Sequence, residues 1–243
     1  MDKLTLKYGK TSVSFSFKNE YYEILKAAKI EPLSDPEQYL ASIIDNPSGF
    51  RTFDQIFSAD DRILIVVSDI TRSTGAKYFL PILLQRLNKA RILDAQISIL
   101  FALGIHRGLT GTERKAIVGE EVARRIAMLD HDPDNRDQME YIGETFRGTP
   151  LLINRNVLEA DVLILTGNIT FHYLAGFGGG GKALLPGVAA TELCMAFHKL
   201  VLKSSNFGIK PKTYAGQMEN NPMHKDILET VNKLSPTFSK PLT

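Results

Sequence analysis

The residues best suited to chemistry lie between positions 172 and 198. The segment His172-Tyr-Leu-Ala-Gly-Phe-Gly-Gly-Gly-Gly-Lys182-Ala-Leu-Leu-Pro-Gly187 is followed by His198, sixteen residues after the lysine. Glycines let a backbone approach a bound group closely and direct its amides at an anion. Because this glycine run places a lysine beside two histidines, we interpret it as a cofactor site.

Three unbroken apolar runs identify the elements that must position these residues. The runs are Ile63–Val67, Ile97–Leu103 and Val162–Leu165. Such runs are typical of parallel strands buried on both faces. Helical stretches are expected near 75–91, 112–128 and 187–203. The alternation of strand and helix predicts an α/β fold, a mostly parallel, Rossmann-like sheet flanked by helices.

Polar residues follow directly after each apolar run. They are Asp69, Thr71 and Arg72 after the first run, His106 and Arg107 after the second, and His172 after the third. In open parallel sheets, ligands bind beyond the carboxyl ends of the strands. We therefore expect these side chains on one rim of the sheet, with the lysine loop following the third strand.

Several of these residues also have a purely structural interpretation. Asp69 is a suitable N-cap for the helix that follows it, and Arg72 is a suitable member of a surface ion pair. A lone histidine on the rim is more often structural than catalytic. His131 lies in a polar turn, where capping or solvent exposure is expected, and His224 is expected to be structural at the start of the last helix.

The ends of the chain differ from its middle. Residues 3–17 alternate apolar and polar positions around Gly9-Lys10, which predicts an N-terminal β-hairpin. Residues 35–44 are expected to be helical. We predict an α/β domain over 1–203, and over 204–243 a linker and a short helix, near 223–233, leading to a C-terminal domain absent from this chain.

Composition narrows the class of protein. The 243 residues are 44% hydrophobic and carry a net charge of +2, which argues against a nucleic-acid surface. No apolar run approaches the ~20 residues of a membrane span, and the N-terminus has no apolar signal core. The single cysteine, Cys194, is expected to be a small buried side chain and fits a reducing compartment, so we expect a cytoplasmic protein.

The lysine loop leaves other functions open. Gly176 to Lys182 nearly matches a nucleotide-binding P-loop, but position 183 is alanine rather than the hydroxyl residue that would hold Mg²⁺. Pro186 also cannot lie inside the helix that should follow. A dinucleotide fingerprint is poorly matched, because the glycines follow the third strand. A P-loop-like nucleotide-binding protein, a non-catalytic binding module and a ligand-free glycine hinge remain as alternatives.

Several motifs, taken in order, resemble the nickel-pincer lactate racemase family, specifically its N-terminal domain. That family has an Asp-x-Thr-Arg motif, matched by Asp69-Ile-Thr-Arg72, and a glycine-histidine-arginine segment, approached by Gly104-Ile105-His106-Arg107. A histidine, a Gly-Gly-x-Lys-x-x-x-Pro-Gly loop and a further histidine complete the pattern, and Asn-Pro-Met-His recurs at 221–224. The resemblance covers most of the chain.

The resemblance implies a cofactor and the residues that hold it. The cofactor would be nickel held by a pyridinium bis-thiocarboxylic acid mononucleotide, tethered covalently through Lys182. His198 would be the protein's nickel ligand, which suits imidazole. The remaining cofactor-binding residues would be Asp69, Thr71, Gly179, Gly180 and Gly181.

The resemblance also implies an isomerase. It would racemise or epimerise lactate-like 2-hydroxy acids by hydride transfer to and from the cofactor, which supplies chemistry beyond side chains. His106 and His172 would be paired acid/base groups, one for each face of the substrate carbon, since histidine exchanges protons near neutral pH. Arg72 would bind the substrate carboxylate or oxygen.

Two departures from the family accompany the resemblance. The family loop commonly contains Ser-Gly-Gly-Arg-Lys, where this chain has Gly179-Gly180-Gly181-Lys182. The family also has a second α/β domain that closes over the cofactor, and this chain stops where that domain would begin. The expected partners are a small 2-hydroxy acid, the missing C-terminal domain and cofactor-biosynthesis enzymes, with no nucleic acid and no membrane.

Overall fold

The structure is a computed structural model that describes residues 2–17, 23, 25–26, 28–48, 52–203, 208–235 and 238. The chain divides into two compact units, Met1–Ser34 and Asp35–Thr243. In the first unit, β1 (Asp2–Tyr8) pairs antiparallel with β2 (Thr11–Phe17). The predicted N-terminal β-hairpin is confirmed.

A four-stranded parallel sheet forms the centre of the second unit. Its strands lie in the order β5-β4-β3-β8. Their bounds are Ile63–Ser68 for β3, Ile97–Ala102 for β4, Ala127–Asp130 for β5 and Val162–Leu165 for β8. The three predicted apolar runs supply the strands β3, β4 and β8, and the α/β fold class is confirmed.

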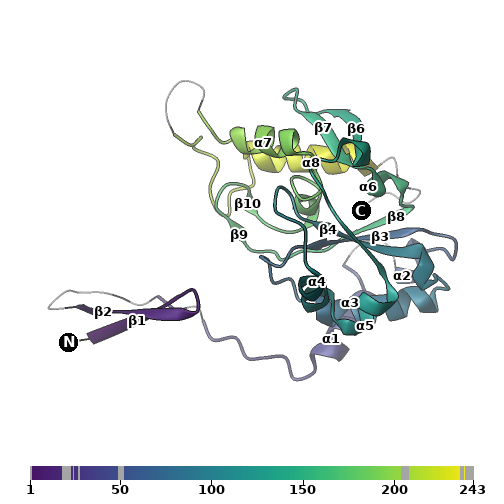
Figure 1. Cartoon of the computed structure of the whole chain (residues 1–243), viewed down its shortest axis with the longest axis horizontal. Helices are drawn as coiled ribbons and strands as arrows, with labels where there is room; N and C mark the ends of the chain where they lie inside the picture. The colour runs from purple at the N-terminus through teal and green to yellow at the C-terminus, as the bar shows by residue number, and fades with distance from the viewer. Residues whose placement is uncertain are drawn as a thin grey trace. The chain divides into compact units, whose positions relative to one another are not determined.

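Each face of the sheet is covered by a separate layer (Figure 1). One apolar core joins the sheet to α3 (Ala76–Lys89), α4 (Gly111–Val118) and α5 (Glu120–Arg125). The other joins it to α7 (Thr191–Lys199), α8 (Pro222–Leu234) and the hairpin of β6 (Met139–Glu144) with β7 (Pro150–Asn154). Successive residues of β3, such as Ile65 and Val66, belong to opposite cores, which explains why the run is apolar throughout.

Shorter elements complete the second unit. They are α1 (Pro36–Asp45), α2 (Phe53–Ile56), α6 (Arg155–Glu159), β9 (Phe171–His172), β10 (Gly176–Phe177) and single 3₁₀ turns at Asp94–Gln96, Arg136–Gln138 and Gly180–Ala183. Within the part of the chain that the structure describes, no helix has both the length and the apolar character needed to cross a membrane.

Two predicted helices differ from the observed ones. The stretch 112–128 is broken at Gly119, whose φ of 89° no other residue type adopts readily, and its end enters β5 instead. The stretch 187–203 begins as a buried turn and becomes helical only at Thr191. The helix predicted near 223–233 is confirmed as α8, and it packs into the core through Met223, Ile227 and Leu234.

Candidate active site

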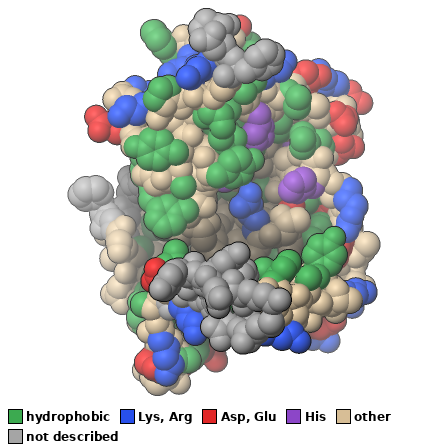
Figure 2. Space-filling view, turned by 90° about the vertical axis from the view of Figure 1, so that its left-hand side faces the viewer, with side chains coloured by type: hydrophobic (Ala, Val, Ile, Leu, Met, Phe, Trp, Pro, Cys, Tyr) green, Lys and Arg blue, Asp and Glu red, His purple; other side chains and the backbone are tan. Residues whose placement is uncertain are grey.

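A cavity of about 480 Å³ opens beyond the carboxyl ends of β3, β4 and β8. Figure 2 shows histidine and basic side chains gathered around a hollow on one face of the molecule. Eight of the predicted site residues line the cavity: Asp69, Thr71, Arg72, His106, His172, Gly179, Lys182 and His198. Gly180 and Gly181 do not line it. The strand ends therefore bring together residues that lie up to 129 positions apart in the sequence.

Asp69 organises the β3 side of the cavity. Its carboxylate is 5% exposed; Oδ1 accepts hydrogen bonds from the Thr71 hydroxyl at 2.6 Å and the Thr71 amide at 3.1 Å. Its other oxygen, Oδ2, lies 2.5 Å from Nδ1 of His106. Asp69 is not the N-cap of α3, because that position is Gly75. The carboxylate instead orients its neighbours in the cavity.

Arg72 reaches the cavity from the same loop. It is exposed, and within the described ranges no hydrogen bond or ion pair of its guanidinium occurs, so the structural alternative of a surface ion pair is not observed. A guanidinium without a protein partner retains its planar set of donors for a carboxylate or phosphate. Arg107 differs, because it pairs with Glu113 at 2.7 Å and does not line the cavity.

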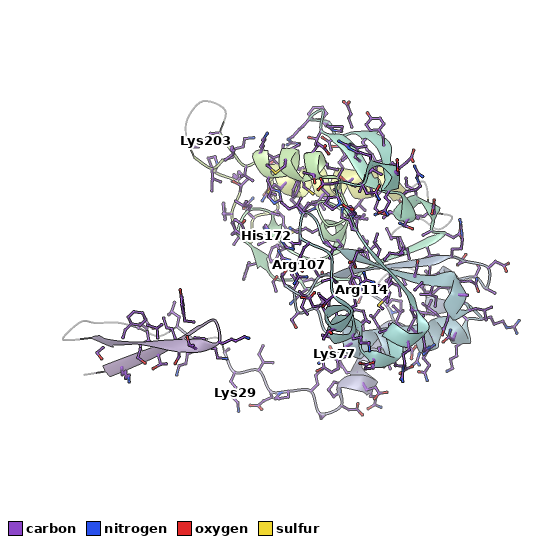
Figure 3. All side chains as sticks on the ribbon, in the orientation of Figure 1. Lys29, Lys77, Arg107, Arg114, His172 and Lys203 are labelled. Atoms are coloured by element: carbon purple, nitrogen blue, oxygen red, sulfur yellow. The ribbon has the colours of Figure 1, made fainter. Side chains whose placement is uncertain are left out.

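His172 lies on β9, in the segment that follows β8, and is 7% exposed (Figure 3). Its Nδ1 accepts backbone hydrogen bonds from the amides of Leu174 at 3.3 Å and Ala175 at 3.0 Å. Burial, followed by the charges of Lys182 and Arg72, lowers the pKa of His172 to about 4. The ring is therefore neutral at physiological pH.

Lys182 lies in the 3₁₀ turn that follows the glycine run. Burial, together with the nearby Arg72 cation, lowers the pKa of its amine to about 8. An amine with a pKa in this range is neutral often enough near pH 7 to act as a nucleophile. Cys194 also lines the cavity, but burial raises the pKa of its thiol to about 12, and it is 1% exposed, as expected for a small buried side chain.

His198 enters the cavity from α7. Its Nδ1 lies 2.7 Å from the carbonyl oxygen of Cys194, one turn earlier in the helix, so Nδ1–H donates and Nε2 keeps its lone pair. This backbone hydrogen bond is the arrangement that orients histidines which bind metals through the other nitrogen. Among the described residues, no group of three or more His, Cys, Asp or Glu side chains is placed to hold a metal ion by itself.

The glycine run packs differently from a phosphate loop. A Cβ at Gly181 would lie 2.7 Å from Cγ2 of Val231 and 2.8 Å from Cγ2 of Ile227, so this glycine lets the loop lie against α8. The amides of Lys182 and Leu184 donate to carbonyls within the loop. No helix follows the lysine directly, since α7 begins at Thr191. A P-loop needs both free amides and that helix.

Sequence reasoning missed two features near the site. His131 was expected to cap a turn or face solvent, and this is wrong: it is 2% exposed, because its Nε2 donates to the Ala189 carbonyl and its Nδ1 accepts from the Asn154 amide. The turn that carries it packs on the loop leading into α7. The stacking of Tyr173 on His172 was not foreseen either, although the two residues are adjacent in sequence.

Comparison with known proteins identifies the family. Residues 8–210 match the model of the lactate racemase N-terminal domain. The chain belongs to that family. It is 33% identical over 241 residues to the lactate racemase of Thermoanaerobacterium thermosaccharolyticum, and 32% identical over 231 residues to that of Lactiplantibacillus plantarum. These alignments cover 98% and 94% of this chain, but 55% and 53% of the relatives, so the chain spans about half the length of the curated relatives it matches.

Solved structures agree with the lactate racemase N-terminal domain assignment. The apoprotein of the Thermoanaerobacterium thermosaccharolyticum lactate racemase superposes with a TM-score of 0.79 at 30% identity, covering 96% of this chain and 54% of that one. A Thermotoga maritima protein superposes with a TM-score of 0.59 at 19% identity, covering 84% of this chain and 48% of that one. The second match supports the fold alone.

Proposed function

We propose that this chain is the cofactor-binding half of an isomerase that racemises or epimerises lactate-like 2-hydroxy acids. One observation carries the proposal. A lysine of lowered pKa, an unpaired arginine and three histidines line a single cavity at the strand ends of a lactate racemase N-terminal domain. This set of groups suits a covalently held cofactor, an anionic substrate and proton exchange in one place.

The residues present fit the nickel-pincer nucleotide that the family resemblance implies. Lys182 offers an amine that is neutral at near-physiological pH, which a covalent tether requires. His198 offers an Nε2 lone pair fixed by its bond to the Cys194 carbonyl, as a nickel ligand requires. Asp69, Thr71 and Gly179 would contact the cofactor from the cavity wall, while Gly180 and Gly181 would support the loop. When bound, the cofactor accepts and returns the substrate hydride.

The chain's own residues would handle the rest of the substrate. Arg72 holds the carboxylate, since its guanidinium has no competing protein anion. His106, oriented by Asp69, takes the hydroxyl proton and later returns it. His172 faces the same substrate from the neighbouring strand end. Closure by a C-terminal domain would exclude water and complete substrate binding.

Loading of the cofactor is the direct test. The chain would be co-expressed with enzymes that make the cofactor, and intact mass and nickel content would be measured. We expect an adduct that peptide mapping places on Lys182, with stoichiometric nickel, and no adduct on Lys182→Arg. Lys199→Arg, on an exposed residue of α7, is the matched control and should load normally. An adduct that persists in Lys182→Arg would refute the tether assignment.

The nucleotide-hydrolase alternative has less support. The lysine loop forms a 3₁₀ turn, two of its amides bond within the loop, and no helix starts at the lysine. These features remove the amide cradle and helix N-terminus that bind phosphates in P-loop proteins. No observation specifically favours a non-catalytic binding module.

A further inference from the structure

The hydrogen bonds of His172 determine which ring nitrogen carries the proton. Its Nδ1 faces two backbone N–H groups, those of Leu174 at 3.3 Å and Ala175 at 3.0 Å. A nitrogen that accepts hydrogen bonds from N–H donors cannot itself be protonated. The single proton of the neutral ring is therefore on Nε2.

His106 is held in the opposite way. Its Nδ1 lies 2.5 Å from Oδ2 of Asp69, and a carboxylate has no proton to donate. Nδ1 of His106 is therefore the donor, and its Nε2 keeps a lone pair. The Asp69 carboxylate is fixed in turn by the Thr71 hydroxyl at 2.6 Å, so the pair has little freedom to rearrange.

We propose that the two cavity histidines are locked in opposite tautomers, so that His106 alone exchanges the substrate proton and His172 is a permanent N–H donor to a substrate oxygen. This inference rests on the proposed function and deepens it. It replaces the expectation that the two histidines are equivalent acid/base groups serving opposite faces of the substrate carbon.

The proton balance closes with one base. As the substrate carbon–oxygen double bond forms, the hydroxyl proton moves to Nε2 of His106, and the C–H electron pair leaves as the hydride that the proposed cofactor accepts. The resulting imidazolium faces the Asp69 carboxylate, which stabilises it. On hydride return to either face of the carbonyl carbon, the same proton goes back from Nε2 to the oxygen. His172 donates a hydrogen bond throughout and transfers no proton.

The local fold opposes a base at His172. Moving its proton to Nδ1 would point that N–H at the amides of Leu174 and Ala175, which are 8% and 0% exposed. Both hydrogen bonds would be lost, and buried N–H groups would be left without acceptors. The turn that follows β9 would have to change before Nε2 could accept a proton.

Nitrogen-15 NMR of the histidine-labelled chain, free of cofactor at pH 7, tests the tautomers directly. We expect the Nε2–H form for His172 and the Nδ1–H form for His106 and His198. His131 is an internal reference for the Nε2–H form, because its Nε2 donates to the Ala189 carbonyl at 3.0 Å. Each signal would be assigned by substituting one histidine at a time. An Nδ1–H or doubly protonated ring at His172 would overturn the proposal.

A substitution series tests the roles in the cofactor-loaded protein. The glutamine amide N–H lies near the position of a histidine Nε2–H, but glutamine cannot accept a proton. We expect His172→Gln to recover most of the racemisation that His172→Ala loses, and to remain within about tenfold of the unaltered chain. His106→Gln should lose about a hundredfold or more, the usual contribution of a general base. A His172→Gln variant as inactive as His106→Gln would overturn the assignment.

The two experiments separate the inference from the proposed function. If the unaltered, loaded chain racemises no 2-hydroxy acid, the proposed function fails. The NMR result still decides whether the histidines hold opposite tautomers, because it needs neither cofactor nor substrate.

Discussion

The ionisation of Lys182 is the property on which covalent attachment depends. With a pKa near 8, about one Lys182 in ten is neutral at pH 7, whereas about one in 3,000 would be neutral at the ordinary value of 10.5. Burial and the Arg72 cation thus raise the neutral fraction roughly 300-fold. We predict that the rate at which a small amine-acylating reagent modifies Lys182 rises with pH to a midpoint near 8.

Quantitative peptide mass spectrometry after short exposures across pH 6–11 would measure this midpoint. The same lysine in the urea-unfolded chain is the control and should titrate near 10.5. Arg72→Gln should raise the midpoint in the folded chain, because it removes a cation that disfavours the charged amine. If Lys182 titrates at the same pH in the folded and unfolded chains, the cavity does not activate it, and the proposed tether loses its physical basis.

Two further predictions concern the walls of the cavity. Gly181→Ala should destabilise the chain by about 1–3 kcal/mol in urea unfolding, because its Cβ would overlap Val231 and Ile227; Gly111→Ala, whose Cβ meets nothing within 4 Å, should be neutral or stabilising, and equal effects would contradict the packing argument. Cys194, with a pKa of about 12, should react with iodoacetamide at pH 8 about a thousandfold more slowly in the folded than in the urea-unfolded chain, and rapid native alkylation would show that the thiol is not buried as described.

The central sheet and its rim could be predicted because the signal is local and strong. Strands β3, β4 and β8 are apolar on both faces, so each appears as an unbroken run, and the polar residues directly after each run must share one edge. Strand β5 gave no such signal. It lies at the edge of the sheet, its exposure alternates along its length, and its sequence continues a helical pattern past Gly119.

Hydrogen-bond partners in the site could not be predicted, because they depend on the path of the backbone. Nothing in the sequence around His172 indicates that the chain turns back to direct two amides at Nδ1. The burial of His131 was missed for a similar reason. Its acidic and proline neighbours suggest a solvated turn, but Asn154 and the Ala189 carbonyl, both distant in sequence, satisfy its ring.

The charges around the cavity account for several properties at once. Its single carboxylate, Asp69, is occupied by Thr71 and His106, so Arg72 and Lys182 face the cavity without an anionic partner. Uncompensated cations in a partly buried site attract anions and also repel one another's charge. The same arrangement therefore favours a carboxylate or phosphate near Arg72 and a neutral amine at Lys182. A second carboxylate beside these cations would weaken both effects, which gives a physical reason for the placement of the one acid in the cavity against a histidine.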